Sequence, residues 1–140
     1  MITAELREGT AVTLRARGFS WASDEPVAAG GTDTGPDPYE LLLGGLASCI
    51  AVTLRLYADH KGIGLTGVDV RLDFERVHAE DCEGCVGRPD GLIERIRSQV
   101  TLHGSFDHAQ RARLAQVAQR CPVHKTLERG ITIVDSVEYR

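Results

Sequence analysis

The chain has 140 residues and a formal net charge of −4, with 42% apolar and 26% charged residues. This length fits one domain, over residues 1–140, and the mild acidity gives no electrostatic footprint for nucleic acid or an anionic membrane. Its 4 cysteines are too few for a secreted disulfide scaffold, and the first residues do not resemble a signal peptide. We therefore expect a cytoplasmic protein that binds neither nucleic acid nor a membrane.

The N-terminal third of the sequence predicts strands followed by a loop. Residues 2–7 and 11–17 are expected to form two strands joined at Glu8-Gly9, because apolar and polar residues alternate in the second of them, as in a half-solvated strand. Residues 20–38 are rich in proline, glycine and aspartate, which is typical of a loop. A short strand near Trp21 is compatible with this pattern.

A long apolar helix is predicted over residues 38–61. Asp37 followed by Pro38 is a favourable start for a helix, and Gly62 is a favourable end. The helix is long enough to cross a membrane, but Arg55 and the pair Gly44-Gly45 favour a core helix. One sheet cannot cover a helix that is apolar on nearly every face, so a second copy of the chain is expected to cover the rest. The sequence thus predicts a homodimer.

The second half of the chain is predicted to contain strands, two helices and a final strand. These elements cover, in order, residues 68–74, 92–103, 108–120, 122–128 and 131–139. Asp107 is the expected cap of the first of these helices. Long strands without a regular strand–helix–strand alternation indicate an α+β fold with a mostly antiparallel sheet.

Two cysteines lie in settings that favour different behaviour. Cys49 is in the middle of the apolar helix, where a thiol is usually a small core hydrophobe. Cys121 directly precedes Pro122 at the expected start of a helix, whose unpaired N–H groups favour a thiolate. His124 would act on Cys121 as a base or simply bond a carbonyl, and the sequence leaves both open.

A reactive Cys49 would need a nearby cation, because only the thiolate is nucleophilic. Arg55 is six positions further along the helix, which places it on roughly the opposite face. The remaining candidates are Arg7, Arg15, Arg17 and Arg120. Spacing alone does not choose among them.

Several motifs together resemble one family. They are Gly35-Pro36-Asp37-Pro38-Tyr39-Glu40-Leu41-Leu42-Leu43, Ala47-Ser48-Cys49 and Cys121-Pro122-Val123-His124, with Asp24-Glu25-Pro26 and Tyr57-Ala58. Over nearly its full length the sequence is similar to the OsmC/Ohr family of osmotically induced and organic hydroperoxide resistance proteins. The resemblance implies an intertwined homodimer in which mostly antiparallel sheets wrap around two central helices.

The same resemblance implies a function and a set of site residues. It indicates a thiol peroxidase for organic hydroperoxides in oxidative-stress defence, without a cofactor, recycled by a lipoyl-type or thioredoxin-type dithiol. Cys49 would be the peroxidatic thiol and Cys121 the resolving one. Arg7 matches the family's arginine in the first hairpin, and Tyr39 and Trp21 are expected to line the substrate pocket.

One position departs from the family pattern. The family's peroxidases carry a glutamate directly after the proline of the helix start, where this chain has Tyr39, and Glu40 comes one residue later. Glu40 is therefore the candidate for the arginine's catalytic partner, but one residue turns a helical side chain by about 100°, which would direct Glu40 away from the thiol. An alternative hypothesis is therefore a binding protein of the same fold, which takes an apolar ligand or a metal with little or no turnover.

A second cysteine pair has the spacing of a metal site. Cys82 and Cys85 are separated by two residues, and His78 precedes them. Two cysteines and a histidine are zinc ligands, although a structural zinc site usually has a second ligand pair downstream. A zinc site, a reversible disulfide and an ordinary polar loop all remain open for this segment.

Overall fold

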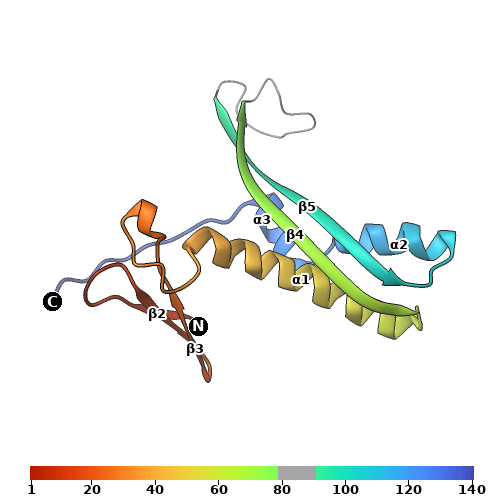
Figure 1. Cartoon of the computed structure of the whole chain (residues 1–140), viewed down its shortest axis with the longest axis horizontal. Helices are drawn as coiled ribbons and strands as arrows, with labels where there is room; N and C mark the ends of the chain where they lie inside the picture. Colours follow the sequence, from red (N-terminus) through yellow and green to blue (C-terminus); the bar gives the residue numbers. More distant parts are fainter. Residues whose placement is uncertain (79–90) are drawn as a thin grey trace. The chain divides into compact units, whose positions relative to one another are not determined.

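The computed structural model describes residues 1–78 and 91–140. It combines helices with antiparallel strands, which confirms the predicted α+β class (Figure 1). Its contacts group into two compact units, Met1–Gly45 with Asp73–Arg97 and Leu46–Leu72 with Ser98–Arg140. The described elements are β1 (Thr3–Glu5), β2 (Val12–Ala16), β3 (Phe19–Ser23), a 3-10 turn (Val27–Ala29), α1 (Pro38–Lys61), β4 (Leu65–His78), β5 (Leu92–Gly104), α2 (His108–Ala118) and α3 (Pro122–Arg129).

The first unit contains an antiparallel sheet in the order β1-β2-β3. Thr3 pairs with Arg15 and Leu14 pairs with Trp21, so each strand bonds to its neighbour in sequence. Gly9 has a φ of 66° in the connection between β1 and β2, a conformation that glycine adopts at little cost. The short strand near Trp21 is present as β3.

A buried carboxylate organises the loop between β3 and α1. Asp24 is only 2% exposed, and its oxygens accept hydrogen bonds from the hydroxyl groups of Thr10, Thr32 and Thr34 and from the backbone N–H of Glu25. The bond from Thr10, followed by that from Thr32, holds the pKa of Asp24 well below its usual range, although burial acts in the opposite direction. One carboxylate thus joins the β1–β2 connection to the loop that leads into α1.

Helix α1 begins and ends where the sequence predicts. At its start the Glu40 N–H donates to Asp37 Oδ1 at 2.8 Å, and the Asp37 N–H donates to Glu40 Oε2 at 2.8 Å. This reciprocal pair is a capping box, which satisfies two backbone donors that the helix leaves free. At the other end Gly62 has a φ of 64°, the left-handed conformation that stops a helix.

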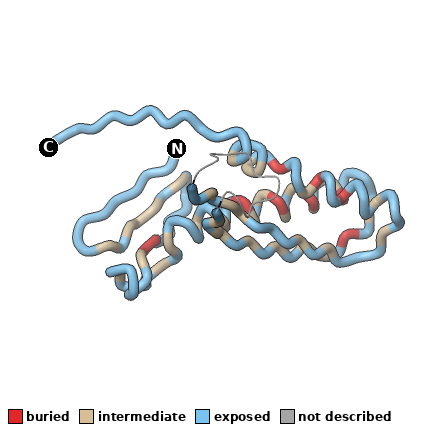
Figure 2. The backbone as a smooth tube through the Cα atoms, turned by 90° about the horizontal axis from the view of Figure 1, so that it is seen from above, coloured by how far each residue is buried: buried red, intermediate tan, exposed pale blue. Residues whose placement is uncertain are grey.

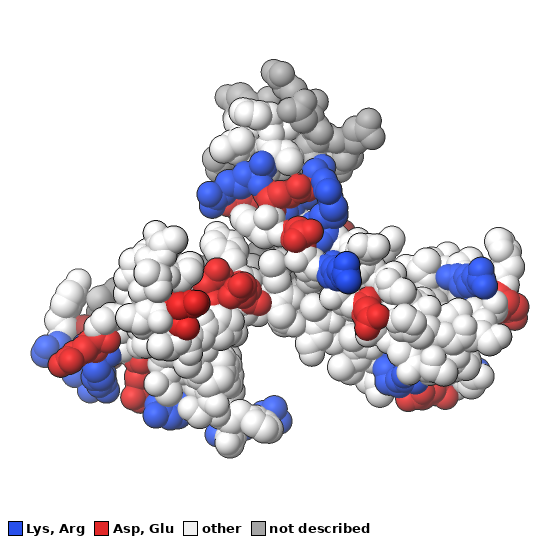
Figure 3. All heavy atoms as spheres, in the orientation of Figure 1, with Lys and Arg blue, Asp and Glu red and all other residues white. Residues whose placement is uncertain are grey.

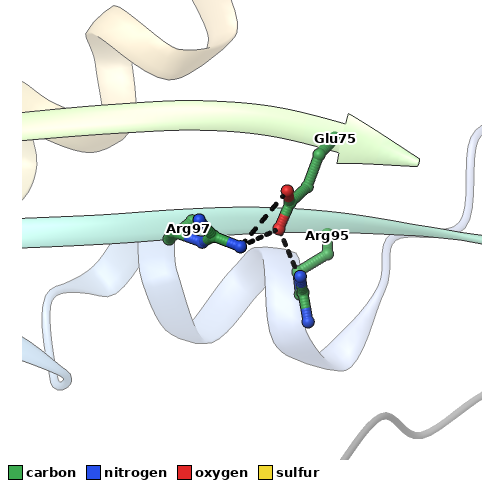
Figure 4. Close-up of polar contacts among 3 residues, drawn as sticks. All are labelled: Glu75, Arg95 and Arg97. Carbon is green, nitrogen blue, oxygen red and sulfur yellow. Dashed lines mark hydrogen bonds and ion pairs between the residues drawn. The ribbon is translucent and has the colours of Figure 1, made fainter. Parts of the chain in front are cut away.

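Strands β4 and β5 form a long two-stranded hairpin that extends beyond both predicted strands (Figure 1). Glu75 on β4 contacts two guanidinium groups of β5, at 2.6 Å from Arg95 Nε and 3.3 Å from Arg97 Nη2 (Figure 4). Arg76 lies 3.3 Å from Glu94 in the same region. On the face in Figure 3, acidic and basic side chains are interspersed along this part of the hairpin rather than gathered by sign.

The core of the second unit is formed by buried residues of α1 and α2, together with Leu65 and Cys121 (Figure 2). The buried residues of α1 recur at every fourth position, which places them on one stripe of the helix. They are Leu46, Ile50, Leu54 and Ala58. Leu114 and Val117 of α2 are also buried.

A second apolar stripe of α1 is uncovered. Leu42, Val52 and Leu56 are exposed, and their spacings of ten and four residues bring them to one side of the helix. By length and composition alone α1 would also suffice to span a membrane, with a mean hydropathy of 1.7 over its most apolar stretch. A core helix of a soluble protein passes the same test.

The predicted final strand at residues 131–139 is wrong. This segment forms no strand in the structure, and its apolar residues are exposed, among them Ile133, Val134 and Tyr139. Alternating apolar residues indicate a preference for extended backbone, but a strand also needs a partner edge for its hydrogen bonds. Within the described residues of one chain, this segment has no such partner.

Candidate functional site

Cys121 is the N-cap of α3. Its backbone is extended, with φ −63° and ψ 148°, and Pro122 occupies the first turn of the helix. The sulfur accepts a hydrogen bond from the His124 backbone N–H at 3.3 Å, in the way that an oxygen side chain normally caps a helix. The residue is completely buried and is not in a disulfide. The helix start predicted from Cys121-Pro122 is therefore present.

Cys49 is a free, half-buried cysteine in the middle of α1. It is seven residues from both Leu42 and Leu56, so it shares a side of the helix with the exposed apolar stripe. Its thiol lies close enough to that of Cys121 to help raise the pKa of Cys121. The fold thus brings together two thiols that are 72 residues apart in the sequence.

The surroundings of Cys121 favour the neutral thiol. Burial raises the pKa of Cys121, while the backbone N–H groups of His124 and Val123 lower it and the adjacent Cys49 raises it again; the net direction is upward. A neutral thiol reacts poorly with peroxides, since the thiolate is the nucleophile. Of the two cysteines, Cys49 is the less buried and is therefore the one that a peroxide can approach.

This pKa direction predicts a pH dependence of stability. A group with a raised pKa in the folded state contributes stability that is present below its unfolded pKa, about 8.5 for a cysteine, and is lost as the pH rises through the folded pKa. Urea unfolding of the reduced protein should therefore give a lower free energy of unfolding at about pH 10 than at about pH 8. The Cys121→Ala variant should lose part of this decline. If the free energy of unfolding of this variant fell as much between about pH 8 and about pH 10 as that of the wild type, the pKa of Cys121 would not be raised by folding.

The candidate arginines of the N-terminal unit have partners near them in sequence. Arg7 lies 3.9 Å from Glu5 and is largely exposed, and Arg15 lies 3.2 Å from the same carboxylate. The Arg17 guanidinium stands 5.0 Å from the centroid of the Phe19 ring. These contacts are exposed and contribute little to stability, so each guanidinium is free to change partners at low cost.

The last candidate, Arg120, lies in the unit that holds the thiols, as does Arg55, which the sequence analysis had set aside. Arg55 donates to the backbone oxygen of Leu65 at 2.6 Å and pairs with Asp59 at 3.4 Å. Arg120 directly precedes Cys121 and is exposed. Within the described ranges, 1–78 and 91–140, no ion pair engages the Arg120 side chain.

The residues at the start of α1 have clear structural roles. The Glu40 carboxylate is turned back onto the Asp37 N–H in the capping box. The Tyr39 ring packs on Phe74 with 4.7 Å between centroids, and Trp21 is half-buried opposite Leu14 in the sheet. The sequence analysis missed the role of Glu40, although an aspartate followed three residues later by a glutamate is a capping-box signature.

The proposed metal site falls mostly outside what the structure describes. Cys82 and Cys85 lie outside the described residues, and His78 is the exposed last residue of β4. Among the residues at 1–78 and 91–140, no three side chains of histidine, cysteine or acidic type form a metal-binding group.

Comparison with known families identifies the family of the chain. A family model described as OsmC-like protein matches residues 31–134. The chain belongs to the OsmC-like family. The match includes both Cys49 and Cys121, and the OsmC/Ohr resemblance seen in the motifs is thereby confirmed. Among curated proteins, none is similar enough to match the chain.

Solved structures of OsmC-like proteins share this fold. An OsmC-like protein from Mycoplasma pneumoniae is 26% identical, with a TM-score of 0.70 over 91% of this chain and 86% of that one. A Psychrobacter arcticus protein, named for a suggested role in osmotic stress and detoxification, is 18% identical, with a TM-score of 0.69 over 89% of this chain and 85% of that one. The organic hydroperoxide resistance protein OhrB of Bacillus subtilis is 20% identical, with a TM-score of 0.58 over 89% and 87%.

Proposed function

We propose that this OsmC-like protein is a cysteine-based reductase of organic hydroperoxides that acts in oxidative-stress defence in the cytoplasm. One observation carries the proposal: two free thiols lie close together in one unit, and one of them is more deeply buried than the other. The half-buried Cys49 is suited to meet the peroxide. Cys121 is fully buried, and burial raises its pKa. It is therefore suited to react with the oxidised Cys49 sulfur rather than with the peroxide.

The reaction follows from the chemistry of the two sulfurs. The Cys49 thiolate attacks the distal oxygen of the hydroperoxide, so that an S–O bond forms, the O–O bond breaks and the alkoxide leaves as an alcohol after taking up a proton. The Cys49 sulfur is thereby oxidised to a sulfenic acid. Cys121 then attacks this sulfur, which forms the disulfide and releases water. An external dithiol, of lipoyl or thioredoxin type, returns two electrons by thiol–disulfide exchange.

Peptide mapping tests the proposal directly. After one equivalent of an organic hydroperoxide, we expect a Cys49–Cys121 disulfide within one chain. Cumene hydroperoxide is a suitable probe because it carries an apolar group. The mapping should be repeated on the double variant Cys82→Ser, Cys85→Ser, in which no other thiol can exchange with the Cys49–Cys121 disulfide. Free thiols at both Cys49 and Cys121 after treatment would refute the reductase function.

We also propose that the working form is a homodimer. The apolar stripe of α1 that includes Leu42, Val52 and Leu56 is exposed in one chain, and Cys49 lies on the same side of the helix. A second copy of α1 related by two-fold symmetry would cover this stripe and shield Cys49 from bulk water. The exposed segment at residues 131–139 would likewise gain a partner edge in such an assembly.

Light scattering decides the oligomeric state. At low micromolar concentration the wild-type chain should have the mass of a dimer. Val52→Glu should yield monomers, because a buried unpaired carboxylate in the interface is strongly unfavourable. The matched control Lys61→Glu, at the exposed end of α1, should remain a dimer. A folded wild-type monomer would show that the stripe needs no second copy.

A binding protein without turnover is the alternative function. Two observations favour it. The family's peroxidases have a glutamate beside their arginine, and this chain has Tyr39 at that position. Its nearest glutamate, Glu40, is engaged in the capping box of α1. Under this alternative the protein would bind the hydroperoxide's apolar group, or a metal, and the peptide map would contain only free thiols.

A further inference from the structure

A trough runs along α2 in the second unit, and its wall adjoins the thiol pair through His124, whose backbone N–H donates to Cys121 Sγ. Its apolar walls come from α1, β5 and α2, and its volume is about 640 Å³, within the usual range for small-molecule sites. The apolar lining consists of Ile50, Val100, Leu102, Phe106, Leu114 and Ala118. Neither Cys49 nor Cys121 lines it.

The two ends of the trough differ in charge. Arg111, Leu114 and Ala118 recur at helical spacing along one face of α2, so positions 111 and 118 are about two turns, or roughly 10 Å, apart along the helix. Among the residues that the structure describes, no hydrogen bond or ion pair engages the Arg111 side chain. Gln119, His124 and Glu128 line the opposite end. An anion is therefore attracted to the Arg111 end and repelled from the Glu128 end.

The far end contains a polar atom without a hydrogen bond. His124 Nδ1 is buried and has no hydrogen-bond partner in the described structure. Glu128 Oε2 lies 3.4 Å away and forms an ion pair with this nitrogen only when the ring is protonated. An unsatisfied buried nitrogen costs free energy, and buried polar groups in native proteins usually have a partner. A polar atom of a bound molecule in the trough would supply one.

We propose that this trough binds an amphipathic carboxylate of medium chain length. The carboxylate pairs with Arg111, the chain lies along Leu114 and Ala118 against β5, and a polar group at the chain end reaches His124. The fit rests on three features of this chain: an unpaired guanidinium, an apolar wall of matching length and an unsatisfied nitrogen. The binding involves no redox step, so it is independent of the reductase function proposed above.

Titration calorimetry with decanoate as the probe tests the site on the full chain. Wild type should bind decanoate about tenfold more tightly than decanol, which has the same chain without the charge; tenfold corresponds to about 1.4 kcal/mol. Arg111→Met should remove this difference while leaving decanol binding unchanged. Arg129→Met, an arginine outside the trough, is the matched control and should change neither affinity.

Two further measurements test the walls and the far end. Ala115→Trp, which fills the trough from α2, should abolish the binding of both probes, with circular dichroism as the check of folding. An ω-hydroxydecanoate should bind more tightly than decanoate in wild type but not in His124→Phe. Equal binding of decanoate by wild type and Arg111→Met would overturn the proposal. A wild type that binds no decanoate would also overturn the proposal. If Ala115→Trp then changes the mass of the assembly, the trough is the surface that contacts a second copy of the chain.

Discussion

Replacing Cys49 by serine should reduce hydroperoxide consumption to the background rate, whereas replacing Cys121 by serine should leave one oxidation per chain. A serine hydroxyl is not ionised at neutral pH and cannot attack the peroxide as a thiolate does. In the Cys121→Ser variant the first step is intact, but the sulfenic acid at Cys49 has no neighbouring thiol to condense with. Stoichiometric consumption, followed by mass spectrometry of a dimedone adduct at Cys49, is the measurement.

The asymmetry between the two variants is what distinguishes the roles. Both serines are close to isosteric with cysteine, and Cys121→Ser keeps a side-chain acceptor for the His124 N–H at the start of α3. Thermal unfolding should therefore be similar for the two variants. If Cys121→Ser lost even the first oxidation while Cys49→Ser retained it, the assignment of peroxidatic and resolving thiols would have to be reversed.

The second large effect is expected at Arg7. If its guanidinium stabilises the Cys49 thiolate, Arg7→Met should slow hydroperoxide reduction on the order of tenfold or more, since one pKa unit changes the thiolate fraction tenfold well below the pKa. Glu40→Gln should change the rate little, because a glutamine side chain also accepts a hydrogen bond from the Asp37 N–H in a capping box. Stopped-flow rates with one organic hydroperoxide compare the two variants.

Other arginines provide the controls for this comparison. Arg15→Met removes a guanidinium that shares Glu5 with Arg7 and should leave the rate within about twofold, because exposed pairs of this kind interact weakly. An unimpaired Arg7→Met would instead move the assignment to Arg120, which directly precedes Cys121. A Glu40→Gln rate as low as that of Arg7→Met would mean that Glu40 leaves its cap and joins the arginine during the reaction.

The helices whose ends are marked by capping residues, proline or glycine were predictable from the sequence. Asp37-Pro38 and Gly62 bound α1 because an N-cap acceptor, a proline and a left-handed glycine each act through the local backbone. The same holds for Cys121-Pro122 at α3 and for Asp107, whose side chain accepts from the Gln110 N–H at 2.8 Å. Local signals of this kind need no knowledge of the tertiary structure.

Features that depend on distant partners were predicted less well. The strand expected at residues 131–139 is absent because its alternating pattern gives no information about an available sheet edge. That Cys49 lies near Cys121 was expected only from the resemblance to a family, since no spacing rule brings residues of different helices together. The carboxylate of Asp24 was read as part of a loop, and its three threonine partners lie 8 to 14 residues away, beyond the range of turn motifs.

The complete burial of Cys121 has a consequence for recycling, if the proposed disulfide forms. Thiol–disulfide exchange requires the incoming sulfur to reach one of the two sulfurs in line with the bond. Cys121 is already inaccessible within a single chain, so the reductant must attack Cys49 and the mixed disulfide must form there. Cys121 is then the leaving group, and because its pKa is raised it leaves slowly. Regeneration by the dithiol, rather than attack on the peroxide, would therefore limit the rate of the cycle.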